Sequence, residues 1–306
     1  MREIISIRAV DVIAGMVAVM LAAWPISAQE LERNEHRPVI SPDGTQIAFM
    51  STSEATGGDW ELFVMDMDGR NLRRLTDNLG WDGYAIWAPD GRSLLFDRSL
   101  SSDDENKAAH VLDLQGGAVT RLAQRDGWFS VSDWRGDHQV AFWEQESQRD
   151  LYLLDTHGTI IRRLTDTPEI SEHDAQISPD GSMIAFASAP VGGGNTHLEL
   201  LDLGSSERRV LRESAGRIYG VSWAPEGQRI AFTDAPGGDD DDADIFVITL
   251  DTGDTEALTS DDSWDHMPVW TRNGTAVVFT SYRSGEERIY LTHGIGTAMR
   301  LWAGDE

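Results

Sequence analysis

The sequence predicts an all-β fold, a β-propeller of six blades in which each blade is an antiparallel sheet of four strands. Three observations support this prediction: a repeat with a period in the forties, a turn signal inside most repeats, and short apolar runs separated by turn residues. A phenylalanine ends a strand-like segment in each repeat, and its six copies are Phe49, Phe96, Phe142, Phe186, Phe232 and Phe279, at spacings of 47, 46, 44, 46 and 47 residues. Such periods are typical of propeller blades, whereas helical solenoids of similar period need longer amphipathic runs.

Each repeat begins with a short strand that leads into a tight turn. Proline presets the backbone φ angle of such a turn, aspartate caps it, and glycine tolerates positive φ. The turn segments are Pro42-Asp43-Gly44, Pro89-Asp90-Gly91, Pro179-Asp180-Gly181, Pro225-Glu226-Gly227 and Arg272-Asn273-Gly274. The third repeat has Trp134-Arg135-Gly136-Asp137 instead, with one more residue before its phenylalanine. We therefore expect a bulge or a longer turn in that blade.

The remaining strands follow in chain order. The second strand has the form Ile47-Ala48-Phe49, in which alanine lets neighbouring sheets approach and phenylalanine fills the gap between blades. The third is an apolar run such as Leu62 to Asp66, and the fourth ends near Leu75-Thr76. The predicted blades cover about residues 36–76, 83–123, 128–165, 173–212, 219–259 and 266–302. Blade six is expected to end with a strand over residues 297–302 and to pack directly on blade one, with little pairing from residues 29–35.

The N-terminus resembles a secretory signal peptide. Arg2 and Arg8 precede an apolar run from Val12 to Trp24, which Pro25-Ile26-Ser27-Ala28 follows. This run of 13 residues is too short to cross a hydrocarbon core of about 30 Å, and no later segment is apolar enough. We expect residues 1–28 to be a signal peptide and residues 29–306 to form the propeller in the periplasm or outside the cell. An uncleaved N-terminal anchor is the alternative.

The composition excludes several classes of partner and chemistry. Acidic residues number 52 against 25 Lys plus Arg, and the net charge of −27 opposes binding to nucleic acid or to anionic membrane surfaces. Lys107 is the only lysine. The chain has no cysteine, which excludes disulfides and thiol catalysis. We expect a monomer with no membrane span, stabilised by packing alone.

The first repeat carries a sequence motif that is similar to the repeat of a known family. The string from Ser41-Pro42-Asp43-Gly44 to Ile47-Ala48-Phe49, ending in Leu75-Thr76, resembles the WD-like Pro-Asp propeller repeat of the TolB family. The resemblance covers nearly all of the chain after residue 28. It extends to the propellers of prolyl-oligopeptidase-type peptidases and of oligogalacturonate lyases, so it indicates the fold rather than the chemistry. The α/β domain that precedes the propeller in TolB is expected to be absent. The segment Gly220-Val221-Ser222-Trp223-Ala224 lacks the last glycine of a nucleophile elbow, and we expect no catalytic serine there.

Three histidines share one register. His36, His173 and His266 each lie eight residues before a turn glycine, and each follows an acid. Equivalent positions of a propeller form a ring around the central channel, where ligands often bind. Neutral imidazoles from several blades could hold a divalent metal, with the preceding carboxylates as further ligands or orienting groups. In oligogalacturonate lyases a histidine-lined metal site occupies a comparable place. The alternative is that each histidine only caps its adjacent loop.

The same register holds Tyr219 in blade five, Gly83 in blade two, and Trp128 or Phe129 in blade three. This mixture of side chains could form a rim that stacks against sugar or peptide. The acidic run from Asp239 to Asp242 is interpreted as solvated charge rather than as a calcium site. Asp66-Met67-Asp68-Gly69 is interpreted as a hairpin turn.

The sequence therefore leaves three functional hypotheses open. The preferred one is a non-enzymatic, TolB-like binding or scaffold module of the cell envelope, which recognises an envelope protein or polysaccharide on one face, with His36, His173, Tyr219 and His266 as ligand-binding residues. The alternative is a metal-dependent oligosaccharide lyase or hydrolase that holds a divalent metal at His36, His173 and His266. The third is a purely structural subunit of a larger complex. No other cofactor is indicated.

Overall fold

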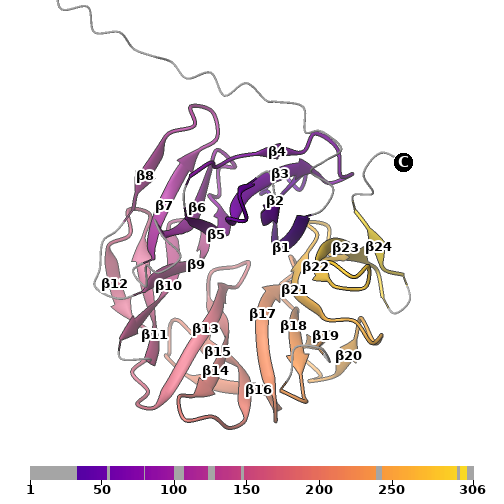
Figure 1. The fold of residues 1–306 in the computed structure, drawn as a ribbon. Coiled ribbons are helices and arrows are strands. Elements are labelled where there is room, and N and C mark those ends of the chain that lie inside the picture. The colour runs from indigo at the N-terminus through magenta and orange to yellow at the C-terminus, as the bar shows by residue number, and fades with distance from the viewer. Residues whose placement is uncertain are drawn as a thin grey trace, which may run out of the picture.

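The computed structural model describes residues 33–53, 56–78, 80–99, 107–122, 128–145, 148–238, 243–294 and 297–301. Within these residues, 24 strands form six four-stranded antiparallel sheets, arranged as a ring around a centre (Figure 1). The described residues contain no α-helix, and none of their segments qualifies as a membrane-crossing helix. The predicted six-bladed propeller is confirmed. The predicted signal peptide and the acidic run 239–242 lie outside the described residues.

The strands of each blade follow one another in the chain. Blade one comprises β1 (Arg33–Ile40), β2 (Gln46–Ser53), β3 (Glu61–Asp66) and β4 (Arg73–Arg74). Blade two comprises β5 (Trp81–Trp87), β6 (Ser93–Ser99), β7 (Ala108–Asp113) and β8 (Val119–Arg121), and blade three β9 (Phe129–Arg135), β10 (His138–Gln145), β11 (Gln148–Asp155) and β12 (Ile160–Arg163). Blade four comprises β13 (Ile170–Ile177), β14 (Met183–Pro190), β15 (Thr196–Asp202) and β16 (Arg208–Ser214). Blade five comprises β17 (Arg217–Trp223), β18 (Arg229–Ala235), β19 (Asp244–Thr249) and β20 (Thr255–Ala257), and blade six β21 (Asp265–Trp270), β22 (Val277–Ser281), β23 (Arg288–Thr292) and β24 (Met299–Arg300).

The Pro-Asp-Gly turns connect the first two strands of a blade. In blade one, Asp43 Oδ1 accepts hydrogen bonds from the backbone N–H of Thr45 at 3.0 Å and from the hydroxyl of Ser41 at 2.6 Å, while Gly44 has a φ of 75°. Asp180 makes the same contacts in blade four, and the hydrogen bond from Ser178 is the first of those that lower its pKa to about 2. In blade three the register of β9 and β10 shifts between Val140 and Ala141, which accommodates the extra residue expected there.

The repeated phenylalanines fill the spaces between blades. Their exposure is 0–1% in five of the six repeats and 8% at Phe142. Phe232 of blade five belongs to one buried cluster with Ala187 and Leu198 of blade four, and Phe96 of blade two to another with Leu62 of blade one. The prediction that these residues form the core between blades is therefore confirmed, and packing of this density makes each gap intolerant of lost volume.

Among the described residues, the first blade and the last share no strand, because β1–β4 and β21–β24 form separate sheets. Arg272 of blade six donates hydrogen bonds to the carbonyl oxygens of Ile40 and Ser41 in blade one, both at 3.0 Å. The N–H of Glu35 donates to the carbonyl of Glu287 at 3.0 Å. Direct packing of blade six on blade one is as predicted. The expectation of little pairing before residue 36 is wrong for residues 33–35, because they pair with residues 51–53 of β2.

Candidate functional site

The innermost strands of all six blades surround a pocket of about 450 Å³ at the centre of the ring, called here the central pocket. Strands β1, β5, β9, β13, β17 and β21 each contribute residues to its wall. His36, His173, Tyr219 and His266 all line it, so the register that singled them out brings their backbones to one place. Pockets of this size with convergent polar groups are typical ligand sites.

A bulge directly follows this register in five of the innermost strands. The pairing register shifts directly after His36, Gly83, His173, Tyr219 and His266. The next residue has a positive φ in each case, and these residues are Arg37, Tyr84, Asp174, Gly220 and Met267, with φ between 49° and 62°. Four of the five are not glycine, which is an uncommon backbone state that clusters at functional sites. A bulge turns the following side chains out of the strand alternation and toward the pocket.

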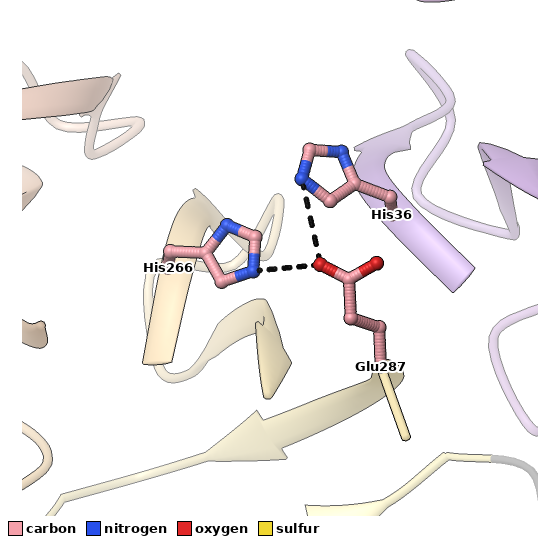
Figure 2. A group of neighbouring side chains, drawn as sticks. All are labelled: His36, His266 and Glu287. Carbon is pink, nitrogen blue, oxygen red and sulfur yellow. Dashed lines mark ion pairs between the residues drawn. The ribbon is translucent and has the colours of Figure 1, made fainter. Parts of the chain in front are cut away.

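His36, His266 and Glu287 converge at one side of the central pocket (Figure 2). Glu287 Oε1 lies 3.5 Å from His266 Nε2 and 3.8 Å from His36 Nε2. One potential ligand atom from each of the three residues lies within 4.8 Å of the other two. The two imidazole rings are 4.8 Å apart between centroids. We call this group the seam cluster, because it joins β1 of blade one to blade six.

Burial keeps the seam cluster uncharged at its histidines. Desolvation, together with a smaller effect of nearby Arg37, lowers the pKa of His266 to about 3. Desolvation, followed by the proximity of His266, likewise lowers the pKa of His36 to about 3. Burial raises the pKa of Glu287, against the opposing effect of His36. Two neutral imidazoles beside a carboxylate are a suitable donor set for a transition metal ion.

His173 takes a different partner. Its Nδ1 lies 3.1 Å from Asp174 Oδ2, and Asp174 Oδ1 accepts a hydrogen bond from Arg37 at 2.8 Å. Burial raises the pKa of Asp174, but Arg37 and His173 outweigh it, and the carboxyl titrates below its usual range. His173 thus lines the central pocket without belonging to the seam cluster. Tyr219 is on β17 of blade five, the blade between those of His173 and His266, and its hydroxyl accepts a hydrogen bond from Trp264 at 2.9 Å.

The acids that precede the histidines do not reach the central pocket, which corrects the expectation that they act as ligands or orient the rings. Asp265 pairs with Arg283 at 2.6 Å and Glu172 with Arg208 at 3.3 Å, while Glu35 Oε2 accepts a hydrogen bond from the N–H of Ile289. Consecutive side chains of a strand point to opposite sides, so these carboxylates face the spaces between blades.

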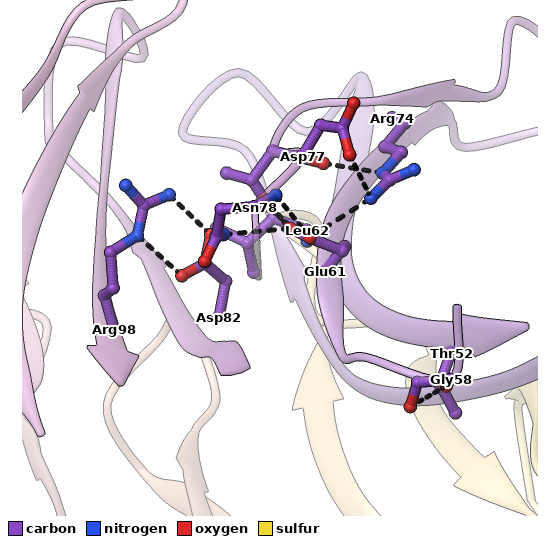
Figure 3. A network of polar contacts seen from close by, with 10 residues as sticks. Thr52, Gly58, Glu61, Leu62, Arg74, Asp77, Asn78, Asp82 and Arg98 are labelled. Carbon is purple, nitrogen blue, oxygen red and sulfur yellow. Dashed lines mark hydrogen bonds and ion pairs between the residues drawn. The ribbon is translucent and has the colours of Figure 1, made fainter. Parts of the chain in front are cut away.

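Asp82, the equivalent acid of blade two, belongs to a polar network between blades one and two (Figure 3). It accepts two hydrogen bonds from Arg98, at 2.8 and 2.6 Å, and one from Asn78 at 2.7 Å. Asn78 in turn donates its backbone N–H to Glu61, which pairs with Arg74 at 3.1 Å. Buried carboxylates of this register are therefore structural.

Of a second group of site residues, the sequence reasoning named only Trp128 as part of the rim. The Arg37 guanidinium lies 4.0 Å from the ring centre of Tyr84, and the Lys107 ammonium lies 4.2 and 4.4 Å from the rings of Trp81 and Trp128. Arg149 covers Trp128 at 4.7 Å. We call these six residues the cation–aromatic array. Lys107 follows no register of the repeat, so only its status as the single lysine could have drawn attention to it.

The three cations of the array are not neutralised equally. Arg37 pairs with Asp174 at 2.8 Å, and Arg149 pairs with Glu144 at 2.6 Å. No carboxylate of the described residues forms an ion pair with Lys107. Burial lowers the pKa of its amine, and Asp97 opposes this shift. Lys107 is therefore a cation held against aromatic faces.

A family model described as the TolB beta propeller domain matches residues 27–190 and 191–304. The chain belongs to this family. Among curated relatives, a TolB homolog of Chlorobium luteolum is 30% identical over 160 residues, which is 51% of this chain and 34% of the homolog. An uncharacterised protein of Agrobacterium fabrum is 25% identical over 151 residues, covering 49% of this chain and 50% of that protein. The chain thus matches half or less of the length of these two relatives.

Solved structures show the same fold at low identity. TolB from Acinetobacter baumannii superposes with a TM-score of 0.64 at 17% identity, over 88% of this chain and 63% of that protein. An oligogalacturonate lyase in complex with manganese gives a TM-score of 0.57 at 16% identity, over 89% and 92% of the two chains. The propeller domain of a protease from Pyrococcus furiosus, described as having an open velcro topology, gives 0.59 at 18% identity, over 88% and 82%. Likeness at this level establishes the propeller fold and no activity.

Proposed function

We propose that this TolB-family propeller is a non-enzymatic binding module of the cell envelope that recognises a protein or an envelope polymer in its central pocket. The observation that carries the proposal is the cation–aromatic array, which lies against a pocket built by all six blades. The family membership and the predicted signal peptide support a periplasmic or secreted location.

The array defines the chemistry of the ligand. Tyr84 and Trp128 line the central pocket, and beside the cations that lie over their faces they offer aromatic contact area to a sugar ring or an apolar side chain. Lys107, which forms no ion pair with the described residues, can bind a carboxylate or phosphate through a charge-assisted hydrogen bond. The chain carries a net charge of −27, so a strongly anionic polymer would be repelled elsewhere on the surface. We infer a peptide or glycan segment with an isolated acidic group.

Affinity capture from Gram-negative envelope protein and polysaccharide fractions tests this function. The wild-type chain should retain a partner that Lys107→Ala and Trp128→Ala both lose, because each substitution removes one half of the recognition surface. Arg209→Ala is the matched control, since Arg209 is an exposed cation on the outer strand β16. A partner that both pocket variants retain as well as the control does would overturn the proposal.

The seam cluster favours a second candidate, a metal-dependent oligosaccharide lyase or hydrolase. A divalent ion held there would act as a Lewis acid beside the pocket, and an oligogalacturonate lyase with manganese shares the fold. Incubation of the metal-loaded chain with acidic oligosaccharides, followed by detection of unsaturated or shortened products, tests this candidate. Products that form equally with wild type and Glu287→Gln would exclude the cluster as the active centre.

A further inference from the structure

We propose that the seam cluster is a divalent transition-metal site that fastens the last blade of the propeller to the first. His36 comes from β1 in blade one, whereas His266 comes from β21 and Glu287 directly precedes β23 in blade six. These two blades share no strand in the described part of the chain, and an ion at this point would cross-link regions that lie 230 and more residues apart in the sequence. This proposal is independent of the ligand that the central pocket binds.

The geometry of the three donors fits a small ion. Ligand atoms of tetrahedral zinc, at bond lengths of about 2.0–2.1 Å, lie about 3.3 Å from one another. Glu287 Oε1 is 3.5 and 3.8 Å from the two Nε2 atoms, and both rings point these atoms toward the carboxylate (Figure 2). A small movement of His36 toward Glu287 would bring the donor atoms to the spacing found around zinc, and the side chain of His36 is 20% exposed.

An unpartnered buried donor is the second observation. The side chain of His266 is only 1% exposed, and neither of its ring nitrogens has a hydrogen-bond partner among the described residues. A buried polar atom without a partner costs about 1–3 kcal/mol, so a partner for these atoms is expected. The ring is held in place by stacking on Trp264 at 4.2 Å, with the two planes only 13° apart.

The donor set also selects the class of ion. Two imidazoles and one carboxylate suit Zn²⁺, Co²⁺ or Mn²⁺, whereas Mg²⁺ and Ca²⁺ prefer sites made of oxygen ligands. His36 and His266 both line the central pocket, so a remaining coordination position would face it. An ion there would stabilise the closed ring because it binds the folded chain and not the separated blades.

Metal titration of the EDTA-treated full chain tests the proposal. Wild type should bind one equivalent of Zn²⁺ and give the visible absorption of four-coordinate Co²⁺. Its Tm should rise by about 5 °C when free Zn²⁺ exceeds the dissociation constant a hundredfold. His36→Gln and Glu287→Gln should each lose the Co²⁺ spectrum and the rise in Tm, and circular dichroism of each variant checks that it is folded.

His173→Gln is the matched control, because His173 has the same register and lines the same pocket but lies outside the seam cluster. It should keep both the Co²⁺ spectrum and the rise in Tm. Failure of wild type to bind either ion, or equal loss of binding in His173→Gln and His36→Gln, would overturn the site. Stoichiometric binding without a change in Tm would overturn its role as a fastener. None of these results depends on capture through Lys107, so this proposal and the binding function can fail separately.

Discussion

The seam between blades four and five differs from the seam between blades six and one in its polar contacts. At the internal seam Leu198, Trp223 and Phe232 share one buried cluster, and Arg212 pairs with the buried Asp234 at 3.2 Å. The closing seam also has an apolar cluster, to which Arg272 adds hydrogen bonds to two backbone carbonyls and the seam cluster adds two histidines and a carboxylate.

The difference reflects how the chain reaches each seam. A short connection, from the end of β16 to the start of β17, already holds blades four and five near each other. Along the chain, blades one and six are connected only through the four blades between them. Their association therefore closes a long loop of the chain. Hydrogen bonds from Arg272 to backbone carbonyls are directional, so they specify how the sheet of blade six is positioned against the sheet of blade one.

The largest expected effect on the free energy of unfolding comes from the buried apolar clusters, which all seams have. Phe186→Ala should lower the free energy of unfolding by about 3–5 kcal/mol, because it opens a cavity in a fully buried cluster with Phe142 and Ile177. Phe49→Ala at the closing seam should cost the same, within about 1 kcal/mol. Urea unfolding at low and high NaCl measures both, with no salt dependence expected. A loss below about 1 kcal/mol would contradict the assignment of the repeat.

Removing the directional link at the closing seam should have the next largest effect. Arg272→Ala removes the donors to two buried carbonyls, and we expect a loss of about 2–3 kcal/mol in urea unfolding. Arg229→Ala is the matched variant at the seam of blades five and six, where one such bond reaches the carbonyl of Gly274 at 3.1 Å. It should cost about 1 kcal/mol. Equal losses would show that the closing seam has no special dependence on polar contacts.

At the seam of blades two and three, we expect the free energy of unfolding to depend on pH through Asp97. Burial raises the pKa of Asp97 to about 6, against hydrogen bonds from Ser130 and Trp128. Lys107 and Arg37 also face this carboxyl and lower its pKa. The unfolded carboxyl titrates near 3.8, so the folded chain binds more protons between about pH 4 and 6.

Stability should therefore fall by about 2 kcal/mol as the pH rises through this window. Asp97→Asn cannot ionise and should not show this fall. Urea unfolding of both proteins at pH 4 and pH 7 gives the difference, in which the other titrating groups cancel. A variant that follows the wild-type pH profile would exclude Asp97 as the cause.

The smallest expected effect is the difference in stability loss between substitutions of two tryptophans at internal seams. Trp223→Phe should cost about 1 kcal/mol because the carbonyl of Gln176 loses its donor. Trp270→Phe should cost less, since the indole N–H of Trp270 has no hydrogen-bond partner among the described residues. Thermal unfolding of the pair measures the difference. A larger loss at Trp270 would indicate that stacking of Arg229 on its ring, at 4.3 Å, outweighs the hydrogen bond.

The sequence by itself determined the architecture and the location of the central pocket. The phenylalanine repeat predicted six blades because each blade must fill the same gap to its neighbour. The shared register of His36, His173, Tyr219 and His266 predicted that their backbones meet, because equivalent positions of a closed ring face one centre.

Only the tertiary structure decided which side chains meet. Glu287 joins His36 and His266 through ring closure, which no spacing within a repeat encodes. His173 turns to Asp174 and Arg37 instead, because the bulge after it places a carboxylate within reach. The Lys107 ammonium lies over the rings of Trp81 and Tyr84 in blade two and of Trp128 in blade three. A repeat determines where the backbone runs, whereas contacts between blades depend on side chains that the repeat leaves free to vary.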